Sequence, residues 1–459
     1  MSCIISSPST DTGKTTLSLL ISCWALTKGL KLQTFKVGPD YLDQEQLSSI
    51  GHPVCRNLDI FLCGEDWVER TFYEQSSKND LALIEGAMGL FDGLGSTHFS
   101  STANIAKVLS LPIVFIINAR GQVGSLLALL KGFQELDKKI TIKGIVFNNV
   151  NSDRHKKLIK EVFRDQPIQI LGFLPFDEKI NLGKSNLGLI SPLELEKKIN
   201  VEYFAKFAEK HLDFSTFLNL LKPIKRKVKK FENINPIEIN SKNPIAIAED
   251  KIFHFQYPET KEYLQEIGIP TISWNILKDE EIPEEAKLLI IPGGFPERYA
   301  QQISDSKRSL DSLRKFYKNK FIYAECGGMM ILGDSIIDEN GFSHKMAGLL
   351  PFKAKKGLLS VGYRYIKGEE NSILLKKDQK IKGHEFHYWQ LDVNIPHLNG
   401  KNKNFDTLFD SPWRIKSWGG NYEKEGWSNK NLHASWIHLH LPSNISAMKN
   451  LLINNMNLQ

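Results

Sequence analysis

A chain of 459 residues with 41% hydrophobic and 24% charged residues has the size and composition of a soluble globular protein of two to three domains, since one domain usually holds roughly 100–200 residues. A net charge of +7 is modest and does not by itself indicate nucleic-acid binding, and no stretch of the sequence resembles a membrane span or a signal peptide. Five scattered cysteines without a CxxC pair argue against a disulfide framework and a zinc site, so we expect a protein of the cytoplasm, which is a reducing compartment.

In the first half of the chain, short strand-like runs alternate with helix-length segments. The runs expected to form strands are 3–6, 32–35, 81–84, 113–117, 144–148 and 170–174, and the expected helices are 15–28, 102–110 and 125–136. Alternation of this kind indicates βαβ crossovers and a mainly parallel sheet.

The sequence CIISSPSTDTGKTTLSLL, at 3–20, is the strongest local signal in this half. Backbone N–H groups at a turn from strand to helix bind phosphate, a lysine there reaches the β and γ oxygens of a nucleotide, and Thr15 offers its hydroxyl to Mg²⁺. Pro8 replaces the first glycine of the usual phosphate-loop pattern, so the prediction of nucleotide binding depends on this placement between strand and helix. The predicted phosphate-binding residues open the helix: Gly13, Lys14, Thr15 and Thr16.

Two further segments place carboxylates near this loop. FKVGPDYLD puts Asp40 and Asp43 after the second strand, and IEGAMGLFDG puts Glu85 at the end of a buried apolar strand. A carboxylate at the carboxyl end of a strand beside a phosphate loop is where a partner of Mg²⁺ is expected, so the predicted metal ligands are Thr15, Asp40 and Glu85. The alternative for the two aspartates is turn chemistry around the Gly-Pro pair of the same segment.

A polar segment at 222–243, interrupted by prolines, has the composition of an interdomain linker. Its run KPIKRKVKK carries six basic residues and no acid, and a nucleic-acid patch is the weaker interpretation because no aromatic residues interleave with the charges. We therefore predict domains at 1–221 and 244–459. Strand-like runs recur in the second of them, at 245–248, 288–291 and 321–324, which indicates a second α/β domain.

The segment YAECGGMM, at 323–330, sets Cys326 between a strand and two glycines. A corner from strand to helix can present a nucleophile on a tight turn, and the free N–H groups of such a turn can bind an oxyanion. Gly327 after the cysteine and Gly294 in LLIIPGGFPER are the candidate oxyanion donors. A buried cysteine beside a plain glycine turn remains the alternative for these residues.

A base for this thiol is offered by HASWIHLHLP, at 433–442, which the pattern predicts to be one strand. A thiol of pKa about 8.5 becomes a thiolate at neutral pH only beside a base or a cation. His438 is our candidate for the base. A purely structural role is the alternative for each of the histidines in this segment, which are His433, His438 and His440.

Seven segments, in order along the chain, resemble those of the cobyrinic acid a,c-diamide synthase family, whose members are glutamine-dependent enzymes of the vitamin B12 pathway: FKVGPDYLD, CRNLDIFL, IEGAMGLFDG, IIPGGFPE, ECGGMM, GHEFHYW and ASWIHLH. The resemblance implies an N-terminal phosphate-loop domain similar to dethiobiotin synthetase and a C-terminal class I, triad-type glutamine amidotransferase domain. It further implies that Cys326 attacks the glutamine amide and that His438 raises its nucleophilicity. Many such glutaminases carry a glutamate two residues after the histidine, where this chain has His440, so the third member of the triad stays open.

The resemblance also implies the reaction, which is amidation of the a and c side-chain carboxylates of cobyrinate. ATP, with Mg²⁺, would convert each carboxylate into an acyl phosphate, from which ammonia released from glutamine displaces phosphate. Two alternatives stay open: a related tetrapyrrole acceptor (hydrogenobyrinate or nickel-sirohydrochlorin), or a phosphate-loop ATPase switch with a degenerate glutaminase module. Small molecules are the expected partners, with neither nucleic acid nor a membrane, and a homodimer is one option for the assembly.

Overall fold

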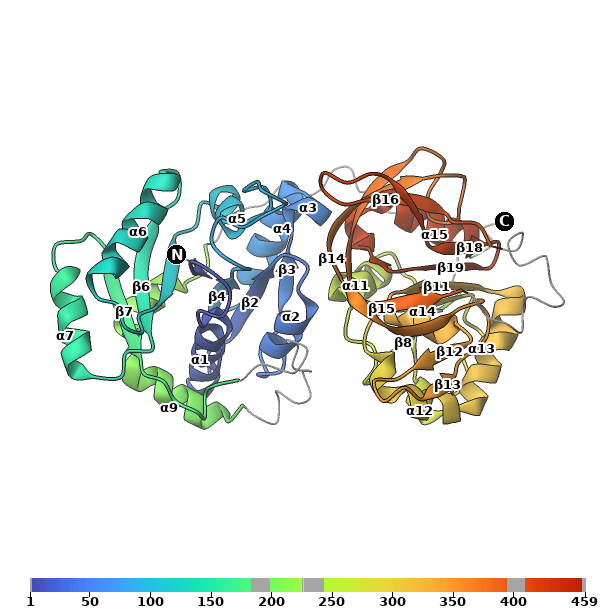
Figure 1. Cartoon of the computed structure of the whole chain (residues 1–459), viewed down its shortest axis with the longest axis horizontal. Helices are drawn as coiled ribbons and strands as arrows, with labels where there is room; N and C mark the ends of the chain where they lie inside the picture. Colours follow the sequence, from blue (N-terminus) through green and yellow to red (C-terminus); the bar gives the residue numbers. More distant parts are fainter. Residues whose placement is uncertain (1, 183–198, 225, 227–242, 394–408, 456–459) are drawn as a thin grey trace. The chain divides into compact units, whose positions relative to one another are not determined.

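The computed structural model describes residues 2–182, 199–224, 226, 243–393 and 409–455 (Figure 1). The chain divides into two compact units, Met1–Lys230 and Phe231–Gln459. The segment 222–243, predicted as a basic linker, lies mostly outside the described residues, and the domain limits placed on either side of it stay predictions. No helix within the described ranges is both long and apolar enough to cross a membrane.

The first unit is built on a seven-stranded sheet in the order β3-β2-β4-β1-β5-β6-β7, in which all neighbouring strands run parallel. Its strands are β1 (Cys3–Ser6), β2 (Leu32–Val37), β3 (Arg56–Leu58), β4 (Leu81–Glu85), β5 (Ile113–Asn118), β6 (Ile142–Asn148) and β7 (Gln169–Leu174). The predicted parallel sheet is confirmed, and each predicted strand lies within an observed one. The sequence did not predict β3, which has only three residues.

Helices cover both faces of this sheet (Figure 1). They are α1 (Lys14–Thr27), α2 (Tyr41–Ser48), α3 (Ile60–Cys63), α4 (Glu65–Ser76), α5 (Thr102–Leu109), α6 (Gly124–Leu136), α7 (Asp153–Val162), α9 (Val201–His211) and α10 (Phe214–Phe217). Successive residues of β1 point to opposite faces, so that Ile5 packs in a core with α1 and α9, and Ile4 packs in a second core with α4 to α7. The helices predicted at 15–28, 102–110 and 125–136 are confirmed as α1, α5 and α6.

The second unit contains a six-stranded sheet in the order β18-β19-β11-β10-β8-β9, in which β18 runs antiparallel to β19 and the other pairs are parallel. Its strands are β8 (Ile245–Ala248), β9 (Thr271–Trp274), β10 (Leu288–Ile291), β11 (Phe321–Glu325), β18 (Trp427–Asn429) and β19 (Leu432–Ser435). The runs predicted at 245–248, 288–291 and 321–324 are β8, β10 and β11, so the second α/β domain is confirmed.

A second sheet in this unit has the order β13-β12-β14-β15-β20, with β16 paired to β14 and β17 paired to β16. Its strands are β12 (Ser335–Ile337), β13 (Ser343–Lys345), β14 (Lys353–Gly368), β15 (Lys380–Asp392), β16 (Trp413–Lys416), β17 (Glu423–Glu425) and β20 (Ile437–His438). The helices of the unit are α11 (Pro258–Glu266), α12 (Ala300–Asp305), α13 (Lys307–Asn319), α14 (Gly327–Leu332) and α15 (Ile445–Asn455), with 3-10 turns η2 (Ile276–Lys278), η3 (Pro296–Tyr299) and η4 (Leu441–Ser443).

The prediction of one strand over 433–442 is wrong, because the chain changes sheets within it. Strand β19 ends at Ser435, and the N–H of Trp436 then donates to the carboxylate of Glu425, 2.8 Å away, instead of continuing the ladder with β11. Strand β20 instead pairs with β15, where His438 lies opposite His384. The change of sheet brings His438 to the place where the two sheets meet.

Candidate active sites

The phosphate loop joins β1 to α1, as predicted. Gly13 precedes the helix with a φ of 112°, a conformation that favours glycine, and a Cβ added there would lie 2.6 Å from Nδ2 of Asn148. Asn148, from the end of β6, donates from the same nitrogen to the carbonyl of Thr12, 2.9 Å away. No side chain caps the first turn, where Thr15 and Thr16 follow Lys14, so its N–H groups suit an anionic ligand such as phosphate.

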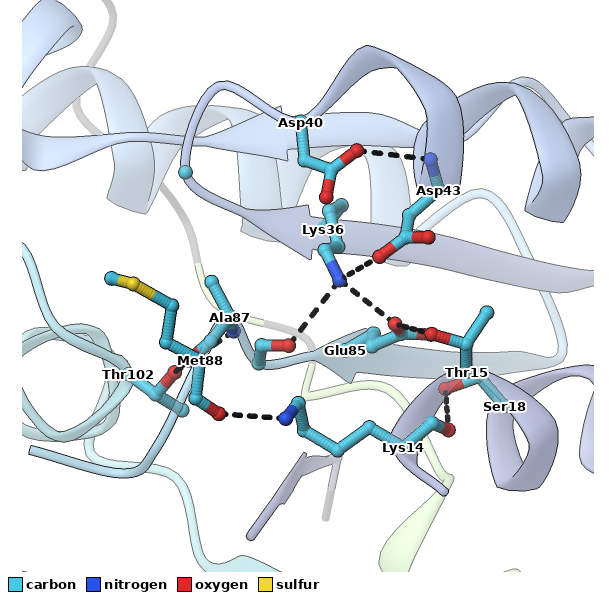
Figure 2. A network of polar contacts seen from close by, with 12 residues as sticks. Lys14, Thr15, Ser18, Lys36, Asp40, Asp43, Glu85, Ala87, Met88 and Thr102 are labelled. Carbon is cyan, nitrogen blue, oxygen red and sulfur yellow. Dashed lines mark hydrogen bonds and ion pairs between the residues drawn. The ribbon is translucent and has the colours of Figure 1, made fainter. Parts of the chain in front are cut away.

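Lys14 reaches back across this loop. Its Nζ donates to Oγ of Ser7 at 2.9 Å, to the carbonyl of Ser9 at 3.1 Å, and to the carbonyl of Met88 at 2.6 Å, the last of which Figure 2 shows. Burial, together with the nearby charge of Lys36, lowers the pKa of Lys14 to about 8. The partners of the ammonium are neutral oxygens, which a nucleotide phosphate would replace with a stronger acceptor.

A buried lysine joins the carboxylates predicted beside the loop (Figure 2). Lys36, in β2, lies opposite Glu85 of β4, and its Nζ is 2.8 Å from Oε1 of Glu85 and also forms an ion pair with Asp43. Burial alone would lower the pKa of Lys36, but Asp43 and Glu85 raise it well above its usual value, so the side chain is charged. Sequence reasoning missed this role of Lys36, although a lysine in a buried strand was a usable signal.

Two of the three predicted metal ligands are in direct contact. The hydroxyl of Thr15 donates to Oε1 of Glu85 at 2.7 Å, and the second oxygen of Glu85, Oε2, is buried without a hydrogen-bond partner in the described part of the chain. An unpartnered carboxylate oxygen beside a hydroxyl fits a hard cation such as Mg²⁺. Among the described residues, no cluster of three or more His, Cys, Asp or Glu residues has an arrangement that could hold a metal ion.

Asp40, the third predicted ligand, caps helix α2. Its Oδ1 accepts a hydrogen bond of 3.0 Å from the N–H of Asp43, which is the local turn chemistry weighed as the alternative. Burial, followed by the charge of Asp43, raises the pKa of Asp40 to about 7. Asp43, and not Asp40, makes the ion pair with Lys36 in this structure.

Cys326 occupies the corner predicted for a nucleophile, between the end of β11 and the first residue of α14. Its backbone has a φ of 45° and a ψ of −112°, a strained conformation for a residue with a side chain, and its N–H is held by the carbonyl of Ser435 at 2.7 Å. The side chain is buried, and Sγ lies 3.6 Å from the carbonyl oxygen of Phe386 in β15. Burial raises the pKa of Cys326 well above its usual value, so the thiol needs a base to react.

The two glycines predicted as oxyanion donors lie together. A Cβ added to Gly327 would be 2.6 Å from the carbonyl oxygen of Gly294, and one added to Gly294 would be 1.8 Å from that of Ile252. Backbones that approach this closely leave no room for a side chain. The requirement for glycine is therefore steric, and it places both turns beside Cys326.

His438 lies against the same glycine loop. A Cβ added to Gly293 would be 2.3 Å from Cε1 of the His438 ring, and the ring of Phe255 packs edge-on against it with centroids 5.5 Å apart. The imidazole is fully buried. The loop after β10 thus contacts the Cys326 turn through one glycine and His438 through the other.

The other two histidines of this segment have structural roles. His433 packs between the rings of Tyr323 and Trp413, at 5.7 and 4.6 Å, and burial lowers its pKa to about 3. Nδ1 of His440 accepts the N–H of Ser443 at 3.2 Å and so caps the turn η4, and burial lowers its pKa to about 3 as well. His440 therefore does not take the role of the glutamate found at this position in many glutaminases.

Glu325, immediately before the cysteine, is the carboxylate that sequence reasoning missed. Its Oε2 lies 3.5 Å from Nδ1 of His438. Glu325 belongs to the segment ECGGMM, but only the fold shows that it lies next to His438 of β20.

The segment GHEFHYW lies in β15 and holds an ion pair. Glu385 accepts hydrogen bonds from Nε of Arg364 at 2.6 Å and from the hydroxyl of Ser360 at 2.9 Å, and it lies 2.7 Å from Nε2 of His387. Burial would raise the pKa of Glu385, but His387 and Arg364 lower it to about 2. These contacts occupy the carboxylate in a structural network close to Phe386 and the thiol.

Comparisons with known proteins find relatives for both halves of the chain. A model of the CobQ/CobB/MinD/ParA nucleotide binding domain matches residues 3–189, and a model of the CobB/CobQ-like glutamine amidotransferase domain matches residues 244–445. A cobyrinate a,c-diamide synthase of Synechococcus sp. is 35% identical over 457 residues, covering 98% of this chain and 98% of its own. A protein of the same name from Caldanaerobacter subterraneus is 35% identical over 447 residues, covering 96% and 95%. Another, from Listeria monocytogenes serotype 4b, is 33% identical over 453 residues, covering 96% of each chain.

Proposed function

The chain belongs to the cobyrinate a,c-diamide synthase family, and from this premise we propose that it amidates the a and c side-chain carboxylates of cobyrinate, with ATP and glutamine, in cobalamin biosynthesis. One observation carries the proposal. A single chain combines a phosphate loop, in which Lys14 is held among neutral oxygens, with a strained and buried Cys326 and a fully buried His438 on either side of one glycine loop. The two sites supply the two half-reactions that an amidating ligase needs.

In the N-terminal unit, the proposed task is to activate the acceptor carboxylate. Gly13, Lys14, Thr15 and Thr16 would bind the phosphates of ATP, with the ammonium of Lys14 balancing charge as the γ-phosphoryl group moves to a carboxylate oxygen. Mg²⁺ would be held by Thr15, Glu85 and Asp40, and when bound it neutralises charge on the phosphates. Support comes from the Thr15 hydroxyl, 2.7 Å from Glu85, and from the orphaned second oxygen of Glu85 within the described residues.

In the C-terminal unit, the proposed task is to release ammonia from glutamine. The thiol of Cys326 attacks the amide carbon while His438 accepts its proton, and the oxyanion is stabilised by the N–H groups of Gly294 and Gly327. His438 returns the proton to the leaving nitrogen, so that ammonia departs and a γ-glutamyl thioester remains. Water, activated by the same histidine, then hydrolyses the thioester to glutamate.

Ammonia and the acyl phosphate meet in the final step. The nitrogen lone pair attacks the acyl carbon, the bond to phosphate breaks, and phosphate leaves with one proton from the nitrogen, so that an amide forms. Since most free ammonia is protonated at neutral pH, a glutaminase in the same chain supplies the reactive, unprotonated form. The cytoplasmic location, a homodimeric assembly and the absence of a nucleic-acid partner stay predictions.

The experiment offers purified protein ATP, Mg²⁺ and glutamine with one acceptor at a time, and mass spectrometry identifies the amides formed. The expected result is a diamide from cobyrinate. If a diamide formed only from hydrogenobyrinate or nickel-sirohydrochlorin, that tetrapyrrole and not cobyrinate would be the acceptor. ATP hydrolysis without use of glutamine or ammonium, with any acceptor, would instead support a phosphate-loop ATPase switch.

Two variants test the division of labour between the sites. Cys326→Ser should lose amidation with glutamine by about 10³-fold or more while amidation with a high ammonium concentration continues, because the thiol acts only in releasing ammonia. Lys14→Ala should lose amidation with both nitrogen sources. If Cys326→Ser retained glutamine-dependent amidation, Cys326 would not be the nucleophile.

A further inference from the structure

The sequence after His438 offers no recognisable third residue for a catalytic triad, but the structure brings Glu325 next to this histidine. We propose that Glu325 is the positioning residue of this site, whose carboxylate orients the imidazole of His438 and balances its charge when it accepts the thiol proton. The inference rests on the proposed glutaminase function and adds a role that the residue pattern after His438 does not reveal. Its basis is the 3.5 Å separation between Oε2 of Glu325 and Nδ1 of His438.

The carboxylate is fixed in place by its other oxygen. Oε1 of Glu325 accepts a hydrogen bond of 3.1 Å from the N–H of Leu439 and another from the hydroxyl of Tyr323. Tyr323 and Glu325 share a face of β11 because strand side chains alternate, and Leu439 directly follows His438. One oxygen therefore anchors the carboxylate to the segment that carries the histidine, and the other lies beside the ring.

Glu325 is also the acid best placed to balance an imidazolium here. Of the ionisable groups around His438, His384 lies opposite it on β15, and burial lowers the pKa of His384 to about 3, so that it stays neutral. Cys326 supplies the proton, and His440 is engaged with the N–H of Ser443. The separation of 3.5 Å exceeds the donor–acceptor distance of a normal hydrogen bond. Catalytic hydrogen bonds are often long before substrate binds and become shorter in the complex with substrate.

The proton balance follows from this arrangement. His438 takes the thiol proton on Nε2 and becomes an imidazolium whose Nδ1–H faces Glu325. The carboxylate accepts the hydrogen bond but not the proton. The proton leaves on the ammonia, and Glu325 is unchanged at the end of each cycle.

Glu325→Gln is the main test, because the amide keeps the size of the side chain and an acceptor for the N–H of Leu439 but removes the charge. We expect kcat for glutamine hydrolysis to fall by about 10³-fold, with little change in the KM for glutamine and no change in ammonium-dependent amidation. Tyr323→Phe is the matched control, since it removes one hydrogen bond to the carboxylate but leaves its charge, and it should lose less than about tenfold.

A second measurement excludes a purely structural role. A cavity of about 60 Å³ lined by Tyr257, Pro292, Tyr323 and Glu325 lies beside the carboxylate and has room for a small anion once the side chain is shortened. Formate should therefore restore part of the glutaminase activity of Glu325→Ala, whereas sodium chloride at equal ionic strength should not. Glu325→Asp, which keeps the charge, should be more active than Glu325→Gln.

Each contrary result is informative. A near-normal kcat for Glu325→Gln, or equal losses in the Asp and Gln variants with no rescue by formate, overturns the role of Glu325. Failure of the proposed glutaminase function would give a different result. In that case wild-type protein would hydrolyse no glutamine, or Cys326→Ser would remain active.

Discussion

The contact between Gly293 and His438 makes the placement of the base directly testable. In Gly293→Ala the new methyl carbon would lie 2.3 Å from Cε1 of His438 and 3.2 Å from Cδ2 of Phe255. Because carbon atoms normally stay about 3.5–4.0 Å apart, the imidazole or the loop must move by about 1 Å or more. The ring is fully buried and packed against Phe255, so it cannot turn aside freely.

A shift of this size should reduce glutamine-dependent catalysis while the protein still folds. Misplacing a catalytic group by about 1 Å can cost about 10²-fold in rate, so glutamine-dependent kcat/KM should fall by about that factor. Inserting a methyl group into a packed site costs about 1–3 kcal/mol, which lowers the melting temperature by about 2–4 °C per kcal/mol in a unit of this size. Ammonium-dependent amidation should not change, because it bypasses the histidine.

The assay measures glutamate release and amide formation with glutamine and with ammonium, alongside thermal unfolding. Gly132→Ala in α6 is the control, since its Cβ would meet no atom within 4 Å beyond the backbone of its own helix and both activities should stay normal. Normal glutamine-dependent activity in Gly293→Ala would refute the placement of His438 against this loop. Equal losses with both nitrogen sources would mean that the change acts on folding and not on the base.

Three further predictions concern charge and metal. Because burial and Lys36 lower the pKa of Lys14 to about 8, the free enzyme should lose affinity for ATP above that pH, by up to about tenfold per pH unit. Chelation of divalent cations should abolish amidation with both nitrogen sources, and Glu85→Gln should raise the Mg²⁺ needed for half-maximal rate by about 10–100-fold. His387 and Arg364 lower the pKa of Glu385 from 4.5 to about 2, against the effect of burial. Between these two pH values the folded protein therefore binds fewer protons than the unfolded chain. Its stabilisation should therefore be complete above about pH 4.5 and fall by about 3 kcal/mol as the pH drops to about 2.

Each of these has a control and a contrary outcome. The affinity for ATP is measured by calorimetry at several pH values. Lys14→Arg stays charged, so its affinity should not change with pH. A wild-type affinity that is independent of pH would contradict the lowered pKa of Lys14. Full amidation in a chelator would exclude the proposed role of Glu85 with Mg²⁺. Urea unfolding of Glu385→Gln should show less loss of stability in acid, and a loss as steep as that of the wild type would mean that other groups cause it.

Local features of the chain were sufficient to predict most of the framework. Six of the seven strands of the first sheet and the helices that begin near Lys14, Thr102 and Gly124 follow from short apolar runs and their spacing, which depend on neighbouring residues alone. The phosphate loop and the Cys326 corner were predictable for the same reason. In each, strand, turn and helix start lie within a few consecutive residues, so the order of residues already determines which groups share the site.

Long-range pairing determined the rest. Lys36 meets Glu85 only because β2 and β4 pair in one register, and His438 reaches Glu325 only because the chain leaves β19 at Trp436 and joins a different sheet. Polar and apolar residues alternate at 433–436 and again at 437–441, with two apolar residues in succession at Trp436 and Ile437. We predicted one strand from this pattern, because the sequence by itself did not show that the two parts pair with different strands. It determined which residue types carry the chemistry and which turns present them. The tertiary structure decided which carboxylate accompanies each cation or base, because that choice depends on backbone hydrogen bonds between segments far apart in the chain.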